Sequence, residues 1–182
     1  MFPAFVKHPQ NFKFQGQDAD EEIVLVIRAH PITNLAWIIP AVFIFLIPFF
    51  VPNFIQFINL DFPPLSPNFS LALLIINFLL VLVITFEGFL NWYFNVNILT
   101  NERLIDVDFS NILLNNQDIA MLSDIQEVSP SRAGLLGLIF DLGDVVVQTA
   151  GARVGIDMIK VPRPYEVADM ILEQAEKAKE TP

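Results

Sequence analysis

The chain has 182 residues, of which 54% are hydrophobic and only 16% are charged, and its mean hydropathy is +0.54. The formal net charge of −10 argues against a nucleic-acid-binding protein and against a polybasic site for lipid head groups, because both need clustered Lys and Arg. The absence of cysteine excludes disulfides, a thiol nucleophile and a Cys-based metal site.

The N-terminal segment, residues 1–33, is predicted to be cytoplasmic and precedes the first long apolar run. Ile23–Ile27 is a short apolar stretch that fits either a strand or an interfacial segment, and periodicity does not distinguish the two. We expect Arg28 and His30 to lie at the level of the membrane head groups. A lone histidine beside Pro31 is typical of an interface residue rather than of a metal ligand or a proton relay.

Two apolar runs, Leu35–Pro52 and Phe69–Phe86, dominate the first half of the chain and contain no charged residue. Each approaches the roughly 20 residues that a helix needs to cross a bilayer core of about 30 Å. We therefore predict a membrane protein with two spans. Pro40 and Pro48 lie inside the first run, where we expect a kink, whereas the second run lacks proline and should be straighter.

The predicted helices, at about residues 34–57 and 69–90, form a transmembrane hairpin over residues 34–90, with a short connector at 58–68. The connector contains no Lys or Arg, whereas basic residues flank the hairpin on both sides. By the positive-inside rule the connector faces outward and both termini are cytoplasmic. The expected location is the cell (inner, cytoplasmic) membrane, with the lipid bilayer as a partner.

Polar and aromatic residues mark the hairpin at particular depths. Trp37 at one end, and Trp92 and Tyr93 beyond the other, fit an aromatic belt on the cytoplasmic side. Asn77 is a candidate intramembrane polar contact: its amide either pairs with the other helix or a backbone carbonyl, or serves an oligomer or substrate path. Glu87 follows the second run near the membrane interface, where we favour a carboxylate that reaches water over one with a functional role.

After the second span the hydrophobic period changes from that of a helix to that of strands. Trp92–Thr100 and Arg103–Phe109 alternate apolar and polar residues, which predicts a β-hairpin that turns at Asn101-Glu102. Later strand-like runs are Ile119–Leu122, Ile125–Val128, Leu135–Phe140, Val145–Thr149 and Val154–Val161. Six or seven short strands with regular turns indicate an antiparallel sheet or barrel.

The C-terminal segment predicts an amphipathic helix. It begins near Pro164, carries an apolar stripe that includes Val167 and Ile171, and ends before a tail, residues 177–182. Acidic residues near its start and lysines near its end suit the helix dipole. This helix would cap the strands.

Four short patterns follow the two apolar helices in a fixed order: Thr100–Ile105, Ile125–Val128, Gly143–Val145 with Thr149–Gly151, and Pro164–Val167. Their order and spacing resemble the bacterial PH-domain (YdbS-like) membrane protein family over about residues 20–175. The resemblance implies a membrane α-helical hairpin plus an α+β, mainly β PH-like barrel, residues 91–176, with a C-terminal capping helix. It also implies no known catalytic activity.

Residues that could carry chemistry are few. Asp141 and Asp144 could, as a pair, bind a cation or do acid–base work, but we favour a β-turn in which they accept hydrogen bonds from nearby backbone N–H groups. No Ser/His/Asp grouping is present, and the glycines of residues 134–151 lack phosphate-loop spacing. We therefore expect no enzyme, no catalytic residue, no metal site and no cofactor.

PH domains that bind inositol phosphates use a basic cluster between their first strands. Here only Arg103 lies in that region, beside Asp106 and Asp108, so phosphoinositide-type head-group binding is not expected. We favour a membrane-anchored interaction or scaffold protein that binds a protein partner or copies of itself. The alternative is an oligomeric subunit of a small membrane transport or channel assembly, with Asn77 facing inward.

Overall fold

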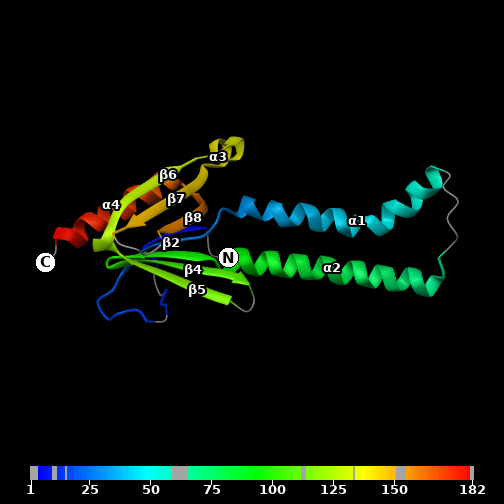
Figure 1. The fold of residues 1–182 in the computed structure, drawn as a ribbon, viewed down its shortest axis with the longest axis horizontal. Helices are drawn as coiled ribbons and strands as arrows, with labels where there is room; N and C mark the ends of the chain where they lie inside the picture. The colour runs from blue at the N-terminus through cyan, green and yellow to red at the C-terminus, as the bar shows by residue number, and fades with distance from the viewer. Residues whose placement is uncertain are drawn as a thin grey trace. The chain divides into compact units, whose positions relative to one another are not determined.

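The computed structural model describes residues 4–9, 12–14, 16–58, 65–111, 114–132, 134–150 and 155–180. The chain divides into two compact units. Unit 1 comprises Met1–Thr33 and Asn91–Pro182, and unit 2 comprises Asn34–Leu90. Unit 2 contains the apolar helices and unit 1 contains the strands, so the break falls where the hydrophobic period changes (Figure 1).

Two long helices form the hairpin that the sequence predicts. A short 3₁₀ turn, η1 (Pro31–Asn34), leads into α1 (Leu35–Phe57), and α2 runs over Pro67–Phe94. Both are long and apolar enough to cross a membrane. Their side chains are exposed around most of the circumference, which suits a lipid environment rather than an aqueous one. Most of the predicted connector, 58–68, lies outside the described residues.

Proline does not interrupt α1. The helix continues through Pro40, Pro48 and Pro52, and its ribbon changes direction in the C-terminal half, whereas α2 runs straighter (Figure 1). A membrane helix tolerates proline because neighbouring groups satisfy the carbonyls that the ring leaves free. Pro67 is the first residue of α2, where a missing N–H costs nothing.

The first sheet of unit 1 has five antiparallel strands in chain order. They are β1 (Phe5–Lys7), β2 (Ile23–Ile27), β3 (Val96–Thr100), β4 (Arg103–Asn111) and β5 (Leu114–Met121). The hairpin predicted at residues 92–109 corresponds to β3 and β4. Its first strand is shorter than predicted, because α2 continues to Phe94 and takes up the alternating aromatic residues 92–94.

The structure shows which conformation is adopted by Ile23–Ile27, the segment that periodicity could not assign. Ile23–Ile27 is strand β2, which is fully buried and pairs antiparallel with β3. The N-terminal residues, set apart in the sequence analysis as segment 1–33, therefore supply two strands to the same sheet. The hairpin of unit 2 is inserted in the chain between two neighbouring strands of that sheet.

The second sheet has three antiparallel strands, β6 (Ile125–Ser131), β7 (Leu142–Thr149) and β8 (Ile156–Pro162), and the turn η2 (Leu122–Asp124) joins it to the first sheet. The run Leu135–Phe140, predicted as a strand, is instead the short helix α3 (Gly134–Phe140). This predicted run has no alternation of apolar and polar residues, and so its pattern fits a helix equally well. Gly151 and Val154 lie outside the described residues.

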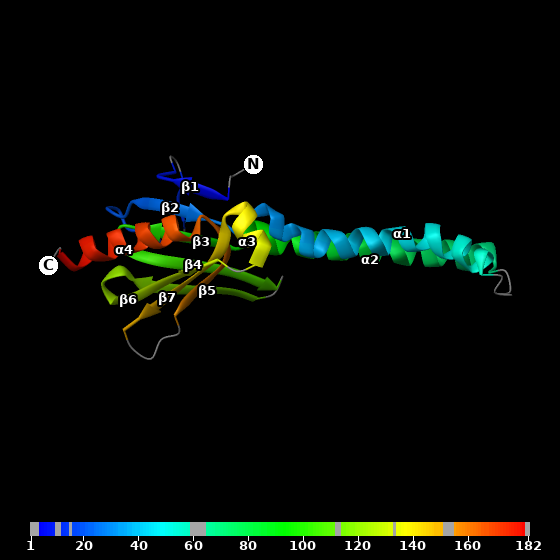
Figure 2. The same cartoon turned by 90° about the horizontal axis from the view of Figure 1, so that it is seen from above.

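Helix α4 (Pro164–Glu180) packs against β6, β7 and η2, and Figure 2 shows it lying lengthwise along unit 1. It extends past the predicted end at residue 176, because Lys177 pairs with Glu173 and Lys179 donates to the carbonyl of Ile125 at 2.8 Å. The predicted fold class is thus confirmed: an apolar helical hairpin, antiparallel sheets and a C-terminal helix that packs on them.

Two apolar clusters stabilise unit 1, one on each face of the five-stranded sheet. The larger lies between the sheets and α4 and includes Leu25, Ile27, Leu99, Leu104, Leu122, Val145, Val147, Val167 and Ile171. The smaller contains Ile98 and Ile105, whose chain neighbours Leu99 and Leu104 belong to the larger cluster. Successive side chains of a strand point to opposite faces, which separates the two clusters. Phe12 and Phe14 partly cover the smaller one.

Candidate functional site

The chain leaves unit 1 for the hairpin, and returns from it, at two segments that are bonded to each other. Trp92 Nε1 donates to the carbonyl of Ala29 at 2.9 Å. The guanidinium of buried Arg28 lies 4.8 Å from the centre of the Tyr93 ring, within cation–π range. Three predicted interface residues, Arg28, Trp92 and Tyr93, therefore gather at one place, which is hereafter the exit region.

His30 also belongs to the exit region. Its backbone N–H donates to the carbonyl of Lys160 at 2.8 Å, and its Nδ1 accepts from the N–H of Ile32 at 3.2 Å. Its ring lies 6.1 Å from that of Phe140, at the end of α3. Burial lowers the pKa of His30 below its usual range, because desolvation disfavours the imidazolium. A neutral ring matches the acceptor role of Nδ1.

The predicted polar contact Asn77 and the predicted interface residue Trp37 both have partners inside unit 2. Asn77 on α2 donates from Nδ2 to the carbonyl of Ile44 on α1 at 2.9 Å, so its amide bridges the helices. Trp37 donates from Nε1 to Asn34 Oδ1 at 3.0 Å. The Trp37 ring lies so close to Gly88 that a Cβ added there would come within 2.5 Å of it.

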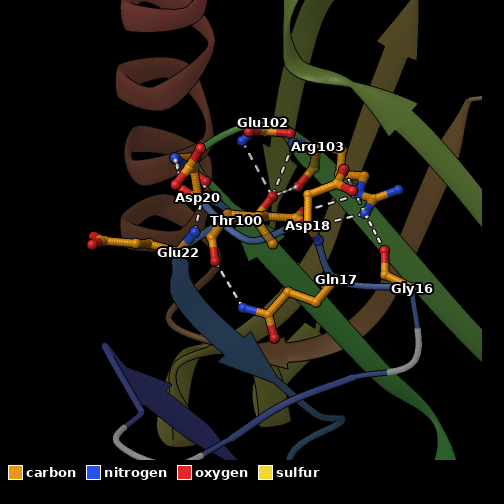
Figure 3. A network of polar contacts seen from close by, with 10 residues as sticks. Gly16, Gln17, Asp18, Asp20, Glu22, Thr100, Glu102 and Arg103 are labelled. Carbon is orange, nitrogen blue, oxygen red and sulfur yellow. Dashed lines mark hydrogen bonds and ion pairs between the residues drawn. The ribbon is translucent and has the colours of Figure 1, made fainter.

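A polar network fixes the N-terminal loop to the turn between β3 and β4 (Figure 3). Arg103 donates from Nε and Nη2 to the two carboxylate oxygens of Glu21, at 2.9 and 2.8 Å. The same Nη2 donates to the carbonyl of Gly16 at 2.7 Å and lies 3.7 Å from Asp18. The Glu21 side chain is fully buried, and that of Arg103 is 15% exposed.

Two further side chains complete this turn. The Thr100 hydroxyl is fully buried and accepts from the N–H groups of Glu102 and Arg103, at 3.2 and 3.0 Å. Asn101 Oδ1 accepts from the N–H of Glu22 at 2.9 Å. The side chains of Thr100, Asn101 and Arg103 thus stabilise the β3–β4 turn and join it to the segment that leads into β2.

The charges of the network stabilise each other. The hydrogen bonds from Arg103 lower the pKa of the Glu21 carboxyl, outweighing the burial that opposes ionisation. Glu21 in turn raises the pKa of Arg103. These contacts hold the Arg103 guanidinium inside unit 1. The expectation that the domain does not bind phosphoinositide-type head groups stays a prediction.

The two aspartates predicted as a pair, Asp141 and Asp144, each bind a different partner. Asp144 Oδ1 accepts from the backbone N–H of Lys160 at 2.6 Å, whereas Asp141 forms an ion pair with Arg132 at 2.5 Å. Gly143 between them is required, because a Cβ there would lie 1.9 Å from the carbonyl oxygen of Ser131. No group of three or more His, Cys, Asp or Glu suited to a metal ion occurs among the described residues.

Sequence reasoning missed two features. The sequence analysis did not indicate Glu21, because its partner Arg103 lies 82 residues further along the chain and leaves no local pattern. The exposed apolar residues Ile119 and Met121 on β5, which are 40% and 50% exposed, gave no signal, because a strand pattern alone does not reveal which face is covered.

The fold combines an apolar hairpin of two candidate membrane-spanning helices with a two-sheet domain on which a C-terminal helix packs. A family model described as "Bacterial PH domain" matches residues 30–175, so the chain belongs to the bacterial PH domain family, and the predicted resemblance is confirmed. The family has no known catalytic role. A search among curated proteins and a search among solved structures each gave no match.

Proposed function

We propose that this protein is a membrane-anchored, non-enzymatic interaction module whose unit 1 lies on the cytoplasmic face and binds a partner protein at the edge of its five-stranded sheet. The charge distribution supports this orientation. All ten Lys and Arg lie in unit 1, whereas the hairpin segment carries only Asp61 and Glu87 as charged residues. Basic residues are retained on the cytoplasmic side of a span, which favours cytoplasmic termini and an outward connector.

The observation that carries the proposal is the outer edge of β5. This strand ends the sheet and pairs only with β4 among the described strands. Ile119 lies opposite buried Ile105, so the exposed Ile119 and Met121 continue the smaller apolar cluster out to the edge. An unpaired strand edge with an apolar strip offers backbone hydrogen bonds and side-chain contacts to an added strand.

The position of this edge favours a protein partner over the bilayer. Met121 is paired with Arg103, beside the turn where β3 ends. Strand β3 starts at Val96, directly after α2, and so this turn is at the end of the sheet remote from the exit region. Unit 1 is also net acidic, which disfavours adsorption to an anionic leaflet.

The alternative of a transport or channel subunit has less support. It required Asn77 to face an oligomer or a substrate path, whereas Nδ2 of this residue donates to Ile44 within the same hairpin. A polar group that is bonded inside its own hairpin needs no partner subunit to satisfy that donor.

Site-specific photocrosslinking tests the proposal. A photoreactive residue is introduced at Ile119 in the full-length protein in its native membrane, and a matched variant carries it at Glu176, an exposed position on α4. We expect a discrete protein adduct at position 119, formed with another protein or with a second copy of the chain, and none at 176. Adducts at both positions, or at neither, would contradict a docking role for β5.

A further inference from the structure

Helix α3 exposes apolar side chains where the surface helix of a soluble domain would normally expose polar ones. Its seven residues, GLLGLIF, include no polar side chain. Gly137 is buried, and a Cβ there would lie 2.9 Å from the carbonyl of Leu142, so the glycine faces the sheet. Leu135, Leu138 and Ile139 share the opposite face and are 78%, 72% and 70% exposed. Single exposed apolar residues are ordinary, but a contiguous apolar helix face marks a contact surface.

The place of α3 within unit 1 identifies what it contacts. Phe140, its last residue, lies against His30, and His30 immediately precedes η1, where the first candidate span begins. Ala29, one residue earlier, accepts the hydrogen bond from Trp92 of the returning segment. Helix α3 therefore lies beside the exit region, and it protrudes past the ends of β6 and β7 (Figure 1).

The geometry points to α3 as a third lipid-contacting element, whose apolar face inserts into the interfacial layer of the bilayer that the hairpin crosses. The chain leaves unit 1 for its spans beside this helix, so the head-group layer begins there. A helix face of Leu and Ile is the kind that lies in the boundary between head groups and acyl chains. This inference goes beyond the proposed protein interaction, which uses the opposite end of the sheet.

The charges around α3 suit insertion driven by apolar contact. Arg132, two residues before the helix, pairs with Asp141, directly after it, so the flanks carry no net charge. The guanidinium of Arg132 also lies 4.7 Å from the centre of the Tyr165 ring. Because unit 1 as a whole is acidic, attraction to anionic lipids would not hold this helix at the membrane. Contact should therefore persist with neutral lipids and at high salt.

The absence of cysteine makes a direct test simple. The variants Leu138→Cys and Leu135→Cys each receive an environment-sensitive fluorophore on α3, and Glu176→Cys is the matched control. Lys179, close to Glu176 on α4, bonds the carbonyl of Ile125 at the start of β6, whereas α3 follows the end of β6. The control therefore lies at the other end of unit 1.

The labelled full-length protein is placed in nanodiscs that hold one copy in neutral lipid, with and without lipid that carries a quencher at a shallow acyl position. We expect blue-shifted emission and salt-independent quenching at 138 and 135, several times that at 176. Blue-shifted emission without lipid quenching would mean that protein covers α3, and water-like emission would mean that nothing does. Either result at both positions, or quenching that high salt abolishes, overturns the inference.

Discussion

Glu21 and Arg103 are 82 residues apart in the chain, yet their side chains form a bidentate ion pair that joins the N-terminal loop to the β3–β4 turn. A buried carboxylate is tolerated only when a charge and hydrogen bonds replace its water. Arg103 supplies two donors and the N–H of Asp18 a third, at 3.2 Å. The Thr-Asn-x-Arg pattern at the turn is therefore a structural motif that fastens β2, rather than a ligand site.

The variant Glu21→Gln should destabilise unit 1 by about 2–4 kcal/mol at pH 7, because it leaves the guanidinium of Arg103 partly buried without its counter-charge. The folded-state pKa of Glu21 lies below the ordinary value of 4.5, so its contribution is present above pH 4.5 and is lost as pH falls through the folded value. The gap between wild type and variant should accordingly narrow in acid.

Unfolding by denaturant in mild detergent at pH 7 and at about pH 3 measures this gap. Glu166→Gln is the matched control, since its pairs with Lys7 and Arg163 are solvent-exposed and should contribute less than about 1 kcal/mol. A gap for Glu21→Gln that stays constant over this pH range would show that its charge does not stabilise the fold.

At the scale of elements, the sequence correctly predicted those helices and strands whose hydrophobic pattern continues over many residues. The two apolar helices and α4 show sustained patterns, and the β3–β4 hairpin has alternation on both sides of a polar turn. Short apolar segments were not decided by pattern: β2 stayed ambiguous, and α3 was predicted as a strand. Tertiary context decides for β2, which gains β3 as a partner, whereas α3 begins at Gly134, whose φ is +74°.

The same distinction between local pattern and tertiary context applies to the candidate site residues. The sequence indicated Arg28, His30, Trp92 and Tyr93 as interface residues, and the structure brings all four to the exit region, although their depth in a bilayer stays a prediction. It did not indicate Glu21, whose burial depends on a partner far along the chain. Such long-range pairings are not visible in a local pattern, because they are set by the topology of the sheet.

The packing of α1 on α2 depends on one glycine near the hairpin's end. The Trp37 ring occupies the space beside Gly88, and so Gly88→Leu should force the ring away and destabilise the hairpin by about 1–3 kcal/mol. Ala72→Leu, on an exposed position of α2, adds a comparable apolar side chain without this overlap. Thermal unfolding in detergent should show a lowered midpoint for Gly88→Leu only; equal midpoints would contradict the packing.

At the scale of the whole molecule, the feature that matters most for folding is the insertion of the helical hairpin between two strands of one sheet. Strands β2 and β3 are hydrogen-bonded neighbours, with Ile27 opposite Asn97, although the hairpin separates them in the chain. An insertion between neighbouring strands tethers unit 1 by two chain segments. The same arrangement means that the domain is discontinuous, since its core contains Leu25 and Ile27 from before the hairpin as well as Leu99 and Leu104 from after it.

Unit 1 should therefore fold without the membrane if its two pieces stay in one chain. The Trp92–Ala29 hydrogen bond brings the cut ends close together, so a flexible linker of about six residues can replace residues 34–90. We expect this closed chain to be a water-soluble, mainly β protein that unfolds cooperatively. Circular dichroism and denaturant unfolding measure both properties.

The matched control is a chain of residues 91–182 alone. It lacks β1 and β2. With β2 and the residues before it, the chain loses two side chains that are fully buried in the larger cluster, the hydrogen-bond partner of β3 and the carboxylate that pairs with Arg103. Removing large core side chains costs about 2–5 kcal/mol each, which approaches or exceeds the whole stability of a small domain. The truncated chain should fail to fold; if it unfolded as cooperatively as the closed chain, β2 would be dispensable and the domain would begin after the hairpin.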